Sequence, residues 1–247
     1  MTYSDHYETL KSNKRLNGMF SYNMVKYTLV VMSLVVPLLG IFREWYIARF
    51  GVETIFQDLR HISLDSEMCL GAWYSASIIL LGACLLYLTS RLARHHGHSD
   101  VWYWRILAIV FVALSLDEET SVHEVFLEPV RDALGVSGVF YYAWVVPALI
   151  LVPLFAAFYI NFLRRLAKPY GFWFFISGAV FATGALGFEM LGGWAYLNYG
   201  PESLEVVVLF VIEESLEIFG MTSFIIALLS YLRHIYGQDA KHWMPLR

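Results

Sequence analysis

The amino-acid sequence predicts an all-α protein, a bundle of helices that crosses a membrane about six times. Hydrophobic residues make up 58% of the 247 residues and charged residues only 15%, whereas soluble domains hold about 45–50% apolar and about 25% charged residues. The apolar residues also gather in stretches of about 20 or more, the length that a helix needs to cross a hydrocarbon core roughly 30 Å thick. Membrane lipid is therefore the expected surroundings of the chain.

Six apolar segments have this length, although acidic residues interrupt the third and the sixth. They lie near 27–46, 68–90, 101–122, 138–161, 171–195 and 205–232. We expect one transmembrane domain at 27–232, with an N-terminal tail at 1–26, an outer loop at 47–67 and a C-terminal tail at 233–247. The first 26 residues are polar and hold no apolar stretch before a small-residue cleavage site, so the first segment is expected to be an uncleaved anchor.

The distribution of Lys and Arg predicts the orientation of the bundle. Twelve of these residues lie in the two tails and in the loops after the second and fourth segments, and four lie in the other connections. Cytoplasmic loops are enriched in Lys and Arg, so both termini are expected in the cytoplasm of a bacterial-type inner or plasma membrane. The formal net charge is −4 and no basic run occurs, which argues against nucleic-acid binding. Aromatic residues at the segment ends, Trp144 among them, are expected to be interfacial anchors without a chemical role.

Acidic residues and one histidine gather in the part of the bundle predicted to face outward. The candidate site residues are Glu118, Glu119, His123, Glu189, Glu213, Glu214 and Glu217. Glu119 and His123 are four residues apart and would share one helix face, which favours Glu119 over Glu118 as the inward side chain. Asp117 falls on a second face, where a solvated helix end explains it equally well. A charge at the bilayer centre costs about 2.5–3.5 kcal/mol on insertion scales, so the deeper acids should face the bundle interior.

This residue set favours a divalent metal ion, with iron or manganese first and zinc second. Carboxylates cannot all ionise close together without cations or protons, and the fifth and sixth segments contain no Lys or Arg. Inward-facing carboxylates with histidine are the ligands of di-iron and di-manganese bundles. This chain departs from that pattern, because Glu119 and His123 are four residues apart rather than three. A metal of this kind would serve an oxidoreductase acting on a lipid-like, hydrophobic substrate, or a hydrolase.

Other interpretations of the same residues stay open. Intramembrane carboxylates also mark cation and proton transporters, although the inner halves of the segments hold few ionisable groups and no inverted repeat is visible. An accessory subunit of a membrane complex, with acids that only hydrogen-bond to neighbouring helices, is a further alternative. The short run at His95, His96 and His98 is more typical of a solvated loop than of a metal site.

Overall fold

The structure is a computed structural model that describes residues 22–51, 60–64 and 69–243. Within these ranges the chain is helical and forms no strand, which confirms the predicted all-α class. Most of the predicted N-terminal tail and much of the predicted loop at 47–67 lie outside the described residues.

Eight α-helices are described, and short helical turns connect several of them. The α-helices are α2 (Tyr22–Phe50), α3 (Leu70–His95), α4 (Val101–Thr120), α5 (Leu127–Leu134), α6 (Val145–Arg165), α7 (Tyr170–Ala182), α8 (Glu189–Tyr199) and α9 (Leu204–Trp243). The short elements are the 3-10 turns η1 (Arg60–Ile62), η2 (Val122–Phe126) and η3 (Gly138–Phe140), and the π-helix η4 (Thr183–Phe188), which joins α7 to α8.

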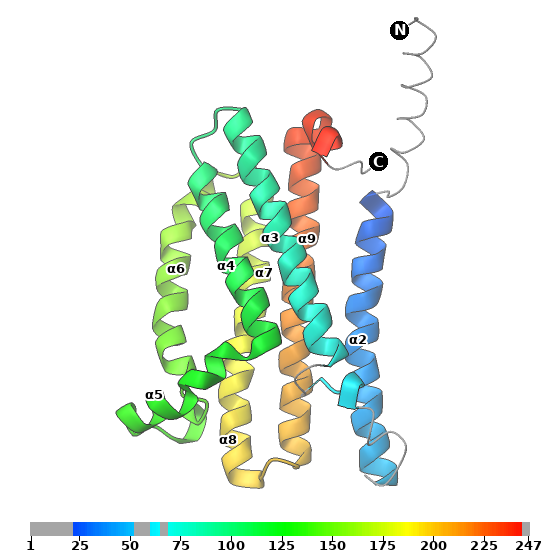
Figure 1. Cartoon of the computed structure of the whole chain (residues 1–247), viewed down its shortest axis with the longest axis vertical. Helices are drawn as coiled ribbons and strands as arrows, with labels where there is room; N and C mark the ends of the chain where they lie inside the picture. Colours follow the sequence, from blue (N-terminus) through cyan, green and yellow to red (C-terminus); the bar gives the residue numbers. More distant parts are fainter. Residues whose placement is uncertain (1–21, 52–59, 65–68, 244–247) are drawn as a thin grey trace, which may run out of the picture.

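The long helices run side by side along one axis, whereas the short helix α5 points away from the bundle (Figure 1). Helix α9 is central, because it packs against α2, α3, α7, η4 and α8. The two ends of the bundle are named by their connections. The α3–α4 end is where α3 is followed by α4, and the α8–α9 end is where α8 is followed by α9 (Figure 1).

Five helical stretches are long and apolar enough to cross a membrane, as a multi-pass membrane protein requires. They are Tyr22–Phe50, Leu70–His95, Val145–Arg165, Tyr170–Tyr199 and Leu204–Gly237. Helix α4 has 20 residues, but Arg105 and the acids near its end make it more charged than the other five. The predicted segment at 138–161 begins later in the structure, at Val145, because residues 138–144 form the 3-10 turn η3 and the turns that follow it. Helix α9 also continues beyond the predicted end at residue 232.

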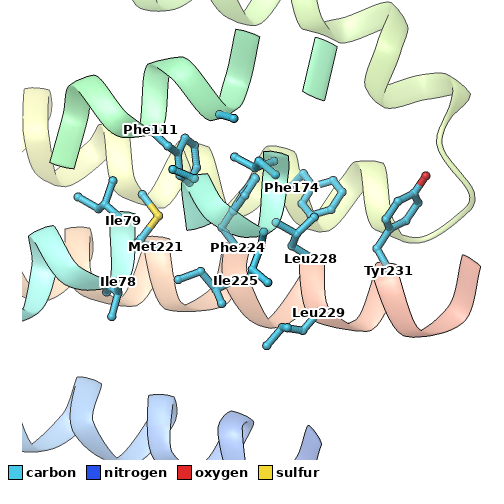
Figure 2. Packing of buried hydrophobic residues seen from close by; sticks show 14 of the residues in the cluster. Ile78, Ile79, Phe111, Phe174, Met221, Phe224, Ile225, Leu228, Leu229 and Tyr231 are labelled. Carbon is cyan, nitrogen blue, oxygen red and sulfur yellow. The ribbon is translucent and has the colours of Figure 1, made fainter. Parts of the chain in front are cut away.

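Large apolar side chains fill the bundle from its middle to the α3–α4 end. Trp104 is only 2% exposed, and its ring lies 4.9 Å from Phe162 and 5.3 Å from Tyr231, measured between centroids. Phe111 and Phe224 meet in the same core at 4.9 Å (Figure 2). These contacts join α4, α6 and α9 into one packed unit that supports the opposite end.

Buried hydroxyl groups connect α2 to the central helices. The hydroxyl of Ser33 on α2 lies 2.5 Å from that of Thr222 on α9 and 2.9 Å from that of Tyr74 on α3. Tyr74 also donates to the carbonyl oxygen of Leu29, at 3.2 Å. Interhelical hydrogen bonds of this kind hold together helices that apolar packing alone does not drive to associate in lipid.

Candidate carboxylate site

Three glutamates on two consecutive turns of α9 begin the site. Glu213 and Glu217 are 8% and 9% exposed, so they are among the few buried acidic side chains of the described chain. Glu214 is partly buried beside them. Glu213 interacts electrostatically with the carboxyl group of Glu189 on α8, and Glu217 interacts electrostatically first with Glu118 of α4. Acids from α4, α8 and α9 therefore meet at one level of the bundle.

Glycine at position 184 allows the π-helix to approach these acids. A Cβ atom on Gly184 would lie 2.8 Å from the carbonyl oxygen of Glu213 and 2.9 Å from Cγ of Glu217, which is closer than side-chain atoms pack. Gly184 belongs to η4, and π-helical turns inside longer helices occur frequently at functional sites. The irregular turn and the glycine together place α8, and with it Glu189, against the acidic turns of α9.

Trp144, at the start of α6, fixes the orientation of Glu189. Its indole Nε1 donates a hydrogen bond to Oε1 of Glu189, at 2.8 Å. The same indole packs against the His123 ring with a centroid distance of 4.7 Å. Trp144 therefore touches the site from a fourth helix, and its sequence-based interpretation as a simple interfacial anchor was incomplete. Its position at a segment end gave no signal of this contact.

A left-handed residue at the end of α4 turns His123 back onto the helix. Ser121 has φ 47° and ψ 39°, and its backbone N–H donates to the carbonyl oxygen of Asp117. The carboxylate of Asp117 then accepts two hydrogen bonds from His123, from the backbone N–H at 2.8 Å and from Nδ1 at 2.9 Å. Burial lowers the pKa of the His123 imidazole, but the hydrogen bond and negative charge of Asp117 outweigh it, so the pKa lies above its ordinary value.

This turn corrects the predicted pairing of Glu119 with His123. Helix α4 ends at Thr120, so the four-residue spacing no longer describes a common helix face. The structure leaves the Glu119 side chain exposed and turns Glu118 inward. Asp117, which sequence reasoning placed on another face, is the partner of His123 instead.

The inward side of Glu118 meets a buried hydroxyl. Ser75 on α3 is 0% exposed, and its hydroxyl lies beside the Glu118 carboxyl. The geometry falls short of a hydrogen bond, so the Ser75 Oγ has no hydrogen-bond partner in the described part of the chain. Buried hydroxyl groups are rarely left unpaired, because each costs about 1–3 kcal/mol. Ser75 thus adds an available polar group to the acids.

Comparison with known proteins identifies a family without a known activity. A family described as "Domain of unknown function (DUF8692)" matches residues 28–232. The chain belongs to this family. No curated protein and no solved structure matches the chain.

The region matched to DUF8692 runs from α2 into α9 and contains the whole set of acids that the fold brings together. We refer to this set as the carboxylate cluster, namely Asp117, Glu118, Glu189, Glu213, Glu214 and Glu217.

Lys and Arg are absent from the stretches of sequence that carry the carboxylate cluster. Between Arg105 and Arg131, and again between Lys168 and Arg233, the sequence contains neither Lys nor Arg. Arg43 on α2 pairs with the adjacent Glu44. Six carboxyl groups and the one imidazole of His123 therefore share this region. Protons or an added cation must supply the balancing charge.

The observed rotamers do not themselves enclose an ion. Within the described ranges, no three His, Cys, Asp or Glu side chains are grouped at metal-ligand spacing. Of the seven residues predicted as ligands, the fold brings together Glu118, Glu189, Glu213, Glu214 and Glu217, with His123 at the rim through Asp117, and it leaves Glu119 outside.

Proposed function

We propose that this protein is a membrane-embedded, metal-dependent enzyme whose divalent ion is held by the carboxylate cluster. The observation that carries the proposal is the meeting of six carboxyl groups from three helices without a Lys or Arg among them. Oxygen and imidazole ligands suit iron or manganese first and zinc second. Glu118, Glu189, Glu213 and Glu217 are the proposed ligands, and binding requires their side chains to turn toward one point.

The reaction that we propose for this site is oxidation of a lipid-like, hydrophobic substrate, with dioxygen as the oxidant. Bound iron or manganese would supply the redox chemistry, and a zinc ion would instead activate water for hydrolysis. The chain's own groups have distinct roles in this proposal. Trp144 keeps Glu189 in place by its hydrogen bond, Asp117 orients the imidazole of His123, and Ser75 offers a free hydroxyl beside Glu118.

The proposal includes a topology of six spans, with α4 as the sixth. Support comes from the packing of α4 along α3, which is itself long and apolar enough to cross a membrane. The excess of Lys and Arg in the tails and at the α3–α4 end supports cytoplasmic termini in a bacterial-type inner or plasma membrane. The carboxylate cluster would then lie in the outer half of the bilayer, where a lipid-like substrate is at hand.

Metal analysis of the purified protein tests the assignment. We expect about one divalent ion per chain in the wild type. Glu217→Gln and Glu118→Gln should lower the metal affinity at least tenfold, because each removes a negatively charged ligand, and loss of a group that only supports a ligand already costs about 10–100-fold. Glu119→Gln is the matched control, since it removes the neighbouring but exposed carboxylate. Wild-type protein that stays metal-free after metal supplementation, or equal metal content in all variants, would contradict the proposal.

A second candidate function is proton or cation transport through the same residues. The electrostatic interaction between the carboxyl groups of Glu189 and Glu213 favours it, because neighbouring carboxyl groups can share a proton. Flux measured in sealed proteoliposomes separates the two functions. Proton or cation flux that is present without added metal and is lost in Glu213→Gln would favour transport over catalysis.

A further inference from the structure

A hollow of about 520 Å³ opens beside the carboxylate cluster at the α8–α9 end. Its lining comes from η2 and α5 on one side, and from α8 and the residues just before α6 on the other. The lining side chains used below are Glu124, Glu128, Arg131, Tyr141, Tyr142 and Tyr196. None of these residues was singled out as a site by the sequence.

Three tyrosines form a fixed aromatic wall in this hollow. The rings of Tyr141 and Tyr196 are stacked, with a centroid distance of 5.0 Å and an angle of 20° between their planes. Tyr142 meets Tyr141 at 5.2 Å. Gly193 on α8 makes this arrangement possible, because a Cβ atom there would lie 3.1 Å from atoms of both Tyr141 and Tyr142. The wall is therefore packed onto the helix rather than free to rotate.

The hollow carries separated charges of both signs. Nε and Nη2 of Arg131 donate to the carbonyl oxygen of Tyr141, at 3.0 and 2.7 Å, and the guanidinium lies 4.2 Å from the centre of the Tyr141 ring. In the described part of the chain, Arg131 forms no ion pair with a carboxylate, and neither Glu124 nor Glu128 forms an ion pair with a cationic side chain. A positive group and two negative groups thus line one hollow without neutralising one another.

The surroundings of the hollow suit a membrane surface. Helix α5 projects sideways from the bundle (Figure 1), and its end and the turn before it expose the apolar side chains of Val125, Phe126 and Leu134, the first of them 70% exposed. Short helices that expose apolar side chains beside charged ones are typical of elements that lie in the interface of a bilayer. Tyrosines at the ends of spanning helices occupy the same level.

We propose that this hollow binds the headgroup of a zwitterionic phospholipid. The phosphate would pair with the free N–H groups of Arg131. The ammonium group would lie against the rings of Tyr142 and Tyr196, because Arg131 and Tyr196 already cover Tyr141. Aromatic rings attract cations through their π faces, and Glu124 and Glu128 would add negative charge. The inference rests on the proposed function and deepens it, because it names the class of the lipid-like substrate. The two sites adjoin, since Glu124 follows His123 in the chain and Tyr142 precedes Trp144 by two residues.

Lipid titration of the purified, delipidated protein in detergent tests this proposal. A short-chain phosphatidylcholine is added and binding is followed by tyrosine and tryptophan fluorescence and by native mass spectrometry. We expect phosphatidylcholine to bind at least tenfold more tightly than phosphatidylglycerol, which lacks the cation, and diacylglycerol, which lacks the whole headgroup. Equal affinity for all three would overturn the proposal. Glycerophosphocholine without acyl chains should bind more weakly, and equal binding would show a soluble ligand instead of a lipid.

Variants separate headgroup binding from folding and from the metal. Arg131→Gln and Tyr196→Ala should each weaken phosphatidylcholine binding at least tenfold, whereas Arg131→Lys, which keeps the charge, should weaken it less. Tyr199→Ala is the matched control, because Tyr199 is an exposed tyrosine on α8 outside the lining. Unchanged binding in Arg131→Gln would refute the assignment.

The metal site can fail independently of this inference. Glu217→Gln should keep its phosphatidylcholine affinity while losing metal. Protein that binds the lipid but never a metal would leave the headgroup site standing and remove the proposed function. Protein that binds a metal but binds all the lipids equally would support the proposed function and remove the headgroup site.

Discussion

The half of the bundle nearer the α3–α4 end, called here the α3–α4 half, buries rings and aliphatic chains. The half nearer the α8–α9 end, the α8–α9 half, buries carboxyl groups. In the first half Trp104, Phe162 and Leu228 are almost completely enclosed, so close packing stabilises the helices against one another. In the second half Glu213 and Glu217 occupy equivalent interior positions. Buried acids without cationic partners destabilise a fold, so the first half must supply the stability that the second half lacks.

The backbone also differs between the two halves. The α8–α9 half contains the π-helix η4 and the left-handed residue Ser121, whereas the α3–α4 half contains a kink of α9 at Tyr236. Left-handed non-glycine residues cost of order 1–3 kcal/mol and persist where the surrounding structure holds them. Here the strained residue brings His123 to Asp117. The α3–α4 half therefore stabilises the bundle, whereas the backbone of the α8–α9 half brings polar side chains together.

The largest expected effect comes from breaking the packed half. Trp104→Ala should lower the free energy of unfolding by about 3–5 kcal/mol, because it removes a fully buried ring that touches three aromatic neighbours. The measurement is a denaturant or SDS titration of the protein in mild detergent. Trp102→Ala is the control, since Trp102 is 67% exposed two residues away. Similar losses in both variants would show that the α3–α4 half is not a packed core.

The sequence predicted those features of the protein that follow from the free-energy cost of placing charged groups in lipid. Apolar stretches of sufficient length identified the helices, and the penalty for a charge in the bilayer correctly placed Glu213 and Glu217 in the interior. The choice between Glu118 and Glu119 went the wrong way, because it assumed that α4 continues to His123. The helix ends at Thr120, where Ser121 takes a conformation that its residue type does not predict.

Contacts made between distant segments were also beyond the sequence. The hydrogen bond from Trp144 to Glu189 joins residues 45 positions apart, and an aromatic residue at a segment end is ordinarily an anchor. Helix α5 was missed because it is too short and too polar to stand out from a connecting loop. The match to DUF8692 covers these positions and assigns no role to them.

The next largest effect is expected at the contact between η4 and α9, in the α8–α9 half of the bundle. Gly184→Ala should destabilise the protein by about 1–3 kcal/mol, because the added methyl group overlaps the Glu213 carbonyl and the Glu217 side chain. Metal content should fall with it, since both acids are displaced. Gly178→Ala, on the same segment, is the control, because a Cβ atom there meets nothing within 4 Å. Equal behaviour of the two alanine variants would argue against a close contact at Gly184.

A smaller effect is expected from the hydroxyl network that joins α2 to the bundle. Thr222→Val removes the hydrogen bond to Ser33 while keeping the side-chain shape. The loss should be about 0.6 kcal/mol and no more than about 1.7 kcal/mol, the mean and the maximum for interhelical hydrogen bonds in a membrane protein. A double-mutant cycle with Ser33→Ala isolates the interaction free energy between the two hydroxyl groups. Strictly additive losses would mean that the two hydroxyls do not interact, and metal content should stay at the wild-type level in every variant.

The smallest effect is expected at Glu119, next to the most crowded acids of α4. Glu119→Gln should change the free energy of unfolding by less than about 0.5 kcal/mol, as exposed substitutions usually do. Glu118→Gln should instead stabilise the chelator-treated protein, because it removes one of several mutually repelling carboxylates. Comparing these two variants shows which side of α4 faces the bundle, because adjacent helical residues point about 100° apart. If Glu119→Gln gave the larger change, α4 would be turned by one residue, and Glu119 would face Glu217 in place of Glu118.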